Sequence, residues 1–190
     1  MKELIKNALI LFAITLVGTI LLAISYQVTE EPIKLQKAKQ TAAANETVMP
    51  GADFEPLVDL DLTKHEKIDS IFAAKNADEI VGYTFKLITD EGYNSGLEII
   101  VGISLEGSVT GVDIVKSSET PGLGAKADDP EFKGKFTDKP LSELTVVKGS
   151  AANENEIESI SGATITSRAV ANAVNEAINY YNNELSKGGN

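Results

Sequence analysis

The longest uninterrupted run of apolar positions lies close to the N-terminus. From Ala8 to Tyr26 only two threonines and one serine interrupt the apolar side chains, and no residue carries a charge. A helix of roughly 19 residues at about 1.5 Å each is about 28 Å long, close to the hydrocarbon thickness of a bilayer. The run predicts a single transmembrane helix, and we assign residues 1–28 to this anchor.

A cleaved signal peptide is the alternative interpretation of the same run. Lys2 and Lys6 fit the basic start of a signal peptide, and Ala23 and Ser25 fit a small-x-small cleavage site. The apolar run is long for a signal peptide, and no clear Ala-x-Ala site follows it. We therefore expect a retained, single-pass anchor.

The residues after the anchor indicate its orientation and a stalk. Lysines lie on both sides of the span, but the later ones are more distant from it and follow Glu30 and Glu31. Basic residues close to a span favour the cytoplasmic side, so we expect a cytoplasmic N-terminus and the bulk of the chain on the extracytoplasmic face of the inner membrane. Residues 29–50 favour helix but offer little apolar surface, and Pro32 suits a first helical turn, which predicts a juxtamembrane stalk.

Strand-like patterns follow from about residue 53. Runs rich in Ile, Val, Phe and Tyr, separated by glycines or acidic turns, predict strands at residues 68–74, 79–88, 96–105 and 108–115. Glu106 and Gly107 leave only a short connection between the last two, which predicts a hairpin. Strands joined by tight turns, with no helix between them, indicate a mainly antiparallel sheet.

The last apolar pattern is helical. Between Ala169 and Leu185 apolar residues recur three and four positions apart, as one face of an amphipathic helix requires. An antiparallel sheet closed by a long C-terminal helix belongs to the α+β class. We therefore expect residues 51–190 to form one extracytoplasmic α+β domain.

Composition narrows the possible functions. The 190 residues include 17 basic and 28 acidic side chains, for a formal net charge of -11, and no cysteine. Such an acidic chain is a poor partner for nucleic acid. Without cysteine, redox activity would need an organic cofactor or a non-thiolate metal. The one histidine, His65, lies among charged residues, so we expect a solvated position and no metal site.

Three hydroxyl-bearing residues and a glycine lie just before the C-terminal helical pattern, in Ser161-Gly162-Ala163-Thr164-Ile165-Thr166. A helix N-terminus presents unpaired N–H groups and the positive end of the helix dipole, which attract phosphate. Gly162 and Ala163 carry almost no side chain, so a bulky group or a modifying enzyme can approach the backbone. Ser and Thr are also ordinary helix caps. The pattern alone leaves two interpretations, a phosphate-ester attachment point and a capped turn.

A second loop rich in turn residues follows the fourth predicted strand, at Glu119-Thr120-Pro121-Gly122-Leu123-Gly124. Proline fixes one backbone dihedral and the two glycines permit left-handed ones, which by itself predicts a pair of turns. The loop lacks the third glycine of a dinucleotide fingerprint and the Gly-Lys-Ser/Thr ending of a Walker loop. As a nucleotide-binding motif it is therefore weak.

These two stretches resemble signatures of the FMN-binding domain family. Ser161-Gly162-Ala163-Thr164 resembles its flavinylation motif, Glu119 to Gly124 its second signature, and Gly92-Tyr93 with Gly96 its first half. In that family a flavin transferase moves FMN from FAD onto the threonine through a phosphodiester bond. The resemblance implies that Thr164 carries covalent FMN, with Thr166 as the neighbouring alternative, and that the loop lies against the flavin.

One position departs from the family pattern. The family has an aspartate three residues before the serine, where this chain has Glu158, a carboxylate on a stem one methylene longer. If the transferase needs the shorter side chain, attachment of FMN would be slow. Arg168, one turn into the predicted helix, is a candidate partner for the phosphate.

With both signatures in this order behind one span, the chain is similar to the G subunits of Rnf electron-transport complexes, relatives of the C subunits of sodium-translocating NADH:quinone oxidoreductases. The resemblance implies an electron-carrier protein of an ion-translocating ferredoxin:NAD oxidoreductase, working with other membrane subunits and not a complete catalyst alone. It also implies a flavin transferase as a partner during maturation.

Two other classes of function stay open from the residues. The first is an extracytoplasmic binding or sensory domain without flavin, in which the Ser-Gly-Ala-Thr turn only caps the last helix. The second is a free-standing flavin reductase, which the lack of a nicotinamide-binding fingerprint in the sequence disfavours.

Overall fold

The computed structural model describes residues 1–58, 60–77 and 79–186. Positions 59, 78 and 187–190, which fall within the predicted domain, lie outside the described residues. The chain divides into two compact units, Met1–Gln40 and Thr41–Asn190. Helix α1, Lys2–Val48, forms the first unit and the start of the second.

The first unit is helical throughout apart from Met1, and its apolar side chains are exposed. Among the described residues, α1 is the one helix long and apolar enough to cross a membrane. Pro32 lies inside this helix, so its expected position in the first turn of a separate helix is wrong. A proline removes one backbone hydrogen bond from a helix, and the helix-forming residues on both sides continue the helix through it.

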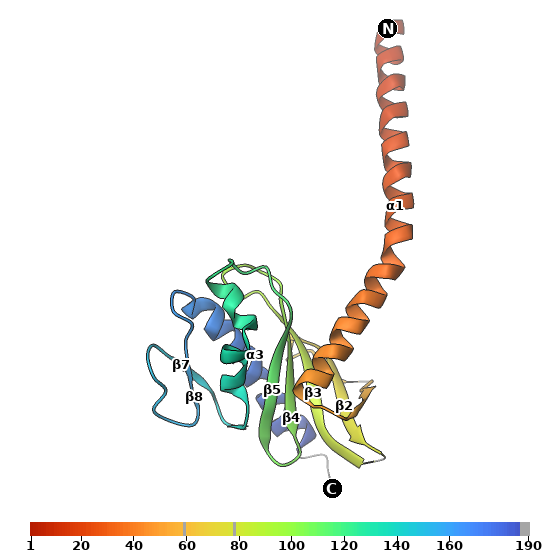
Figure 1. Cartoon of the computed structure of the whole chain (residues 1–190). Helices are drawn as coiled ribbons and strands as arrows, with labels where there is room; N and C mark the ends of the chain where they lie inside the picture. The colour runs from red at the N-terminus through yellow and green to blue at the C-terminus, as the bar shows by residue number, and fades with distance from the viewer. Residues whose placement is uncertain (59, 78, 187–190) are drawn as a thin grey trace. The chain divides into compact units, whose positions relative to one another are not determined.

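The second unit is built on a six-stranded antiparallel sheet with the order β1-β2-β3-β4-β5-β6 (Figure 1). The strands are β1 Asp53–Pro56, β2 Ile68–Asn76, β3 Glu79–Thr89, β4 Leu97–Ser104, β5 Ser108–Lys116 and β6 Lys139–Pro140. The four predicted strands are confirmed as β2 to β5, and the predicted hairpin is the β4–β5 pair. The sequence pattern does not predict the short edge strands β1 and β6.

One face of the sheet packs against the C-terminal helix α3, Thr164–Tyr180, which continues as a π-helical turn, Tyr181–Leu185. Alternate residues of β3 and β4 point to this face, and Phe85, Leu87 and Ile99 are fully buried there. The helix contributes mainly small apolar residues to the same core: Ala169, Val170, Ala173, Val174, Ala177 and Ile178. The long C-terminal helix and the α+β class are confirmed.

The last turn of α1 packs on residues of the opposite face of the sheet. Ala44 and Val48 are buried together with Ile100 of β4. A Cβ at Gly102 would lie 3.2 Å from the Cβ of Val48, so this glycine leaves room for the helix. The stalk was expected to offer little apolar surface, but its C-terminal turn does bury apolar side chains, because glycine on the sheet lets a single turn approach closely.

Short elements that the sequence pattern does not predict connect β5 to α3. They are η1 Gly124–Asp128, α2 Pro130–Lys133, η2 Gly134–Phe136 and the parallel pair β7 Thr145–Val147 with β8 Glu156–Glu158. Phe132 and Phe136 of this segment stack edge to face and are buried in the main core. After this connecting segment the first turn of α3 lies beside the loop that follows β5, where Thr166 is hydrogen-bonded to Glu119.

His65 differs from the sequence-based expectation of a solvated surface residue. Its side chain is 17% exposed, and its Nδ1 lies 2.7 Å from Oε1 of Glu176 on α3. The ring also packs edge to face against Tyr180 at 5.0 Å. The charged neighbours of His65 in the sequence predict an exposed side chain. Its partners Glu176 and Tyr180 come from the other end of the chain, so the local sequence does not indicate them.

Candidate functional site

The first turn of α3 is held without a side-chain cap. The cap position is Ala163, which has no hydroxyl, and no side chain among the described residues bonds the first amides of the helix in the manner of a cap. Instead, Oγ of Ser167 accepts a hydrogen bond from the Ile160 amide at 2.9 Å and donates one to the Ala163 carbonyl at 3.0 Å. The turn is therefore anchored from inside the helix, and Thr164 is free of a capping role.

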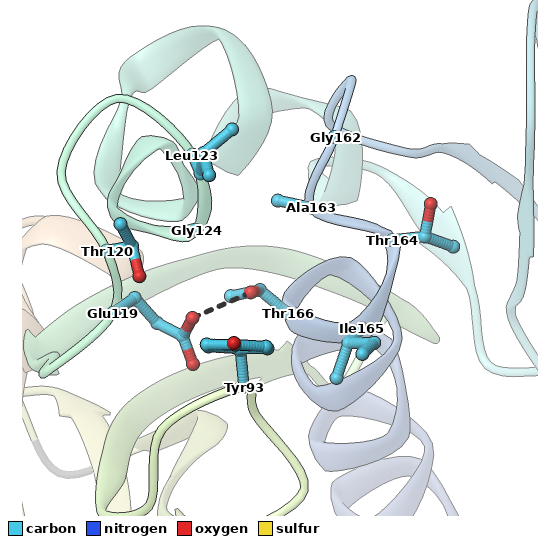
Figure 2. Close-up of a pocket in the computed structure, with 10 residues that line it drawn as sticks. All are labelled: Tyr93, Glu119, Thr120, Leu123, Gly124, Gly162, Ala163, Thr164, Ile165 and Thr166. Atoms are coloured by element: carbon cyan, nitrogen blue, oxygen red, sulfur yellow. Dashed lines mark hydrogen bonds between the residues drawn. The ribbon is translucent and has the colours of Figure 1, made fainter.

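The two threonines of this turn have different surroundings. Thr166 is 1% exposed, and its hydroxyl donates a hydrogen bond of 2.9 Å to Oε2 of Glu119. Thr164 is half-buried, and its hydroxyl makes no hydrogen bond within the part of the chain that the structure describes. In Figure 2 the Thr164 side chain points away from the pair formed by Glu119 and Thr166. Of the two threonines, Thr164 is thus the one whose hydroxyl solvent and another molecule can reach.

Glu119 joins three segments at this site. Its side chain is 6% exposed and belongs to the loop after β5. Besides the hydroxyl of Thr166 it binds the backbone amide of Asn94, at 3.1 Å from Oε1, in the loop between β3 and β4. The Asn94 side-chain amide in turn donates to the Ser118 carbonyl at 2.8 Å. One buried carboxylate therefore connects two loops and the start of α3.

Two glycines make room for this carboxylate. A Cβ at Gly92 would lie 2.4 Å from Oε1 of Glu119, and a Cβ at Gly124 would lie 2.3 Å from Oε2. The Cβ at Gly124 would also meet Oγ1 of Thr166 at 2.6 Å. These separations are shorter than any contact a carbon atom makes with oxygen without displacement, so both positions require glycine as long as Glu119 stays in place.

A cavity of about 530 Å³ opens between the two loops and the first turn of α3 (Figure 2). Its walls combine the buried carboxylate of Glu119 with apolar and aromatic side chains that remain largely exposed, at 69% for Tyr93, 45% for Leu123 and 52% for Ile165. The full lining is Tyr93, Glu119, Thr120, Leu123, Gly124, Gly162, Ala163, Thr164, Ile165 and Thr166. A cleft with apolar walls and a few convergent polar groups is the usual form of a site for an organic ligand.

The structure brings together most, but not all, of the residues proposed from the sequence. Glu119, Thr120, Leu123, Gly124, Gly162, Ala163 and Thr164 line this cavity. Pro121 and Gly122 form the exposed outer part of the loop, where Gly122 has φ +78°. Ser161 and Glu158 line a second hollow of about 510 Å³, and Thr164 and Gly162 line both. Thr164 therefore borders both the main cavity and the second hollow.

Glu158 and Arg168 lie outside the main cavity. Glu158 is the last residue of β8, and its carboxylate lies 3.8 Å from Nζ of Lys135. Arg168 is exposed, four residues beyond Thr164 on α3, which puts both on the same side of the helix. An arginine at this spacing can reach a group attached to Thr164.

Tyr93 and Ile165 line the cavity, although neither is among the site residues predicted from the sequence. The sequence offers Thr166 only as an alternative attachment point, whereas its hydroxyl is committed to Glu119. A signal for Tyr93 is present, because it follows Gly92 in the stretch that resembles the first family signature. For Ile165, an apolar residue next to two threonines gives no sign of whether it faces the core or a cavity.

Comparison with known proteins gives matches over nearly the whole chain. Residues 92–179 match the family model of the FMN-binding domain, and residues 1–48 match that of the RnfG N-terminal region. The chain is 40% identical to the G subunit of the Na(+)-translocating ferredoxin:NAD(+) oxidoreductase complex of Acetobacterium woodii, over 98% of this chain and 95% of that protein. It is 34% identical to the G subunit of the ion-translocating oxidoreductase complex of Methanosarcina acetivorans, over 94% and 95% of the two chains.

A solved structure shares the fold of about two thirds of the chain. The C subunit of the Na(+)-translocating NADH-quinone reductase from Parabacteroides distasonis superposes with a TM-score of 0.51. It is 27% identical, and the match covers 64% of this chain and 66% of that chain.

Proposed function

This chain belongs to the family of G subunits of ion-translocating oxidoreductase complexes of the Rnf type, and we propose that it relays electrons through an FMN joined by a phosphodiester bond to Thr164. Membership makes it one part of a multi-subunit oxidoreductase, with an FMN-binding domain at residues 92–179. An FMN-binding domain in such a complex supports an electron-carrier role. The covalent bond and the residue that forms it are the new part of the proposal.

The accessibility of the Thr164 hydroxyl is the observation that supports this proposal most directly. It is accessible and free of hydrogen bonds within the described part of the chain, and it adjoins a cavity with apolar walls. Thr166, two residues on, is buried and bonded to Glu119, which disfavours it as the attachment point. A ring system tethered to Thr164 would reach the cavity because the same residue lines it.

Attachment is an exchange of one phosphate bond for another. The Thr164 oxygen attacks the phosphorus on the riboflavin side of FAD, the bond between the two phosphates breaks, and AMP leaves with the bonding electrons. The hydroxyl proton passes to a base of the flavin transferase. The first amides of α3 and the positive end of its dipole favour the phosphate that remains on Thr164, and the exposed guanidinium of Arg168 adds a positive charge one turn away.

The residues of this chain tether and orient the cofactor. Bound FMN supplies the reversible electron transfer, since the isoalloxazine ring is left free by a phosphodiester linkage. Leu123 and Ile165 provide apolar walls that exclude water from the ring. Glu119 holds the two loops and α3 in one arrangement, so that the cavity is formed before the cofactor enters.

Two further assignments are part of the proposal. The transferase recognises the segment from Glu158 to Thr164, because the exposed residues Glu158, Ser161 and Gly162 line one hollow together with Thr164. The domain at residues 51–190 faces the extracytoplasmic side, behind an anchor at residues 1–28 and a stalk at residues 29–50. A covalent tether is useful there, because a flavin that dissociated outside the cytoplasm would be lost.

Co-expression of the full chain with a flavin transferase tests the covalent bond. Denaturing gel electrophoresis should show a fluorescent band for the wild type and for Thr166→Val, and none for Thr164→Ala. Because the helix cap is Ala163 rather than Thr164, Thr164→Ala should also change the free energy of unfolding by no more than about 0.5 kcal/mol. A colourless wild-type band with an active transferase would leave the flavin-free binding domain as the better account.

A further inference from the structure

Tyr93 is a largely exposed aromatic side chain that lines the cavity. It is 69% exposed in the loop between β3 and β4. Three of the other four tyrosines pack in or against the hydrophobic core, at positions 83, 180 and 181, and Tyr26 lies in the apolar run of α1. An exposed aromatic ring in a cleft offers a large flat apolar surface to a ligand.

The loop that carries Tyr93 is anchored on both sides of it. The Asn94 amide is bonded to Glu119, and the Gly96 amide donates to Oδ1 of Asp90 at 2.7 Å. On the other side, Gly92 lies so close to Glu119 that no Cβ fits between them. The backbone at Tyr93 is therefore constrained although the ring itself is exposed. We expect this combination of a residue that binds a ligand.

The chemistry of the remaining walls indicates a flat ring as that partner. Tyr93, Ile165 and Leu123 all line the cavity (Figure 2), and Leu123 comes from the loop after β5. Aromatic rings pair with other flat ring systems in offset stacks, which contribute roughly 0.5–1.5 kcal/mol beyond the area that they bury. The hydroxyl of Thr164 lies on the same cavity, so a ring tethered there comes within reach of Tyr93.

We propose that Tyr93 stacks on the isoalloxazine ring and that Glu119 is the positioning residue that holds Tyr93 in place. The inference rests on the proposed covalent FMN and adds a specific ring contact to it. Glu119 reaches Tyr93 only through the backbone of Asn94 and the packing at Gly92, so its effect on the flavin is indirect.

Flavin fluorescence measures this contact. An excited flavin takes an electron from a tyrosine in contact with it, and the electron returns without emission of light, so that stacking lowers the fluorescence. The chain has five tyrosines and no tryptophan, which leaves few possible donors. The full-length, flavinylated chain is compared as wild type, Tyr93→Leu and Tyr93→Phe, with emission normalised to the FMN found by intact mass.

Both substitutions should raise emission per FMN several-fold, because neither leucine nor phenylalanine donates an electron to the flavin. Tyr93→Phe keeps a ring to stack and should retain the visible circular dichroism of the bound flavin, whereas Tyr93→Leu should lose it. Tyr83→Phe removes a tyrosine that lies outside the cavity and serves as the matched control, with unchanged emission.

The role of Glu119 has its own pair of variants. Glu119→Ala frees the loop and should raise emission part of the way toward that of Tyr93→Leu. Glu119→Gln keeps one acceptor oxygen and should restore most of the quenching, which a general loss of stability would not explain. Emission that stays at the wild-type level in Tyr93→Phe and Tyr93→Leu, with FMN attached, would overturn the stacking alone. A wild-type chain without FMN would overturn both proposals together.

Discussion

The hydroxyl of Thr166 donates a hydrogen bond of 2.9 Å to Oε2 of Glu119, across 47 positions of sequence. This bond joins the first turn of α3 to the loop after β5 and withdraws one of two neighbouring threonines from solvent. The other threonine, Thr164, lies two residues earlier and points away from the pair (Figure 2). The helix thus separates a structural hydroxyl from an accessible one within a single turn.

Removal of the Thr166 hydroxyl should destabilise the domain without loss of the flavin. In Thr166→Val the buried Oε2 of Glu119 loses its donor, which costs about 1–3 kcal/mol. Urea unfolding of the full chain in detergent measures this cost, with Thr166→Ser as a control that keeps the hydroxyl and should lose much less. Equal stability of the valine and serine variants would show that the bond contributes nothing.

Gly124 should be intolerant of even one added methyl group. In Gly124→Ala the new carbon would lie 2.3 Å from Oε2 of Glu119, and relief of that overlap costs about 1–3 kcal/mol. Gly134 is the matched control, since a Cβ there has nothing within 4 Å and its φ is −61°. Thermal unfolding should show a lower Tm for Gly124→Ala and an unchanged or slightly higher Tm for Gly134→Ala. A tolerant Gly124 would mean that Glu119 is not held where the structure has it.

Glu91 should make stability depend on pH in the acid range. Hydrogen bonds from Lys67 and Asn172 hold the pKa of Glu91 below its ordinary value of 4.5. Its contribution is therefore fully present above the unfolded pKa and is lost as the pH falls through the lower folded pKa. The carboxylate is 42% exposed, so we expect less than about 1 kcal/mol after screening by solvent.

Urea unfolding between neutral pH and pH 3 measures this contribution. The difference in unfolding free energy between the wild type and Glu91→Gln should shrink as the pH falls, and Lys67→Met should show the same trend. A difference that stays constant across the range would exclude Glu91 as a source of acid sensitivity.

The lack of cysteine in the sequence makes the orientation in the membrane directly testable. Glu3→Cys and Ser150→Cys each introduce one thiol at an exposed position, on either side of the predicted span. A maleimide that cannot cross membranes should label Ser150→Cys in intact spheroplasts and leave Glu3→Cys unlabelled until the cells are broken. The reverse pattern would put the domain in the cytoplasm.

The sheet could be predicted because its long strands carry their own pattern. Strands β3 and β4 are runs of eight or more residues rich in Ile, Val and aromatic side chains, and β4 is buried along almost its whole length because both of its faces are covered. The edge strand β6 has two residues and the parallel pair β7–β8 has three each, too short for any period. Their structure depends on neighbours that are distant in sequence.

The site could be predicted in part, from turn residues and family signatures. Both loops around the cavity are identifiable in this way, but the burial of the Thr166 hydroxyl beside an accessible Thr164 is not. Which hydroxyl turns inward depends on the phase of α3 and on Glu119, which is 47 positions away. The family signature includes Tyr93, but the sequence does not predict its place in the cavity, which depends on a bond between the neighbouring Asn94 and the same carboxylate.

The mass of one peptide from native membranes decides whether Thr164 carries the flavin. Trypsin cleaves after Lys148 and Arg168, which yields residues 149–168 with both threonines. We expect this peptide to be heavier by one FMN less one water, with fragment ions that assign the added mass to Thr164. Detection of the bare peptide alone, in membranes with an active complex, would contradict the covalent attachment.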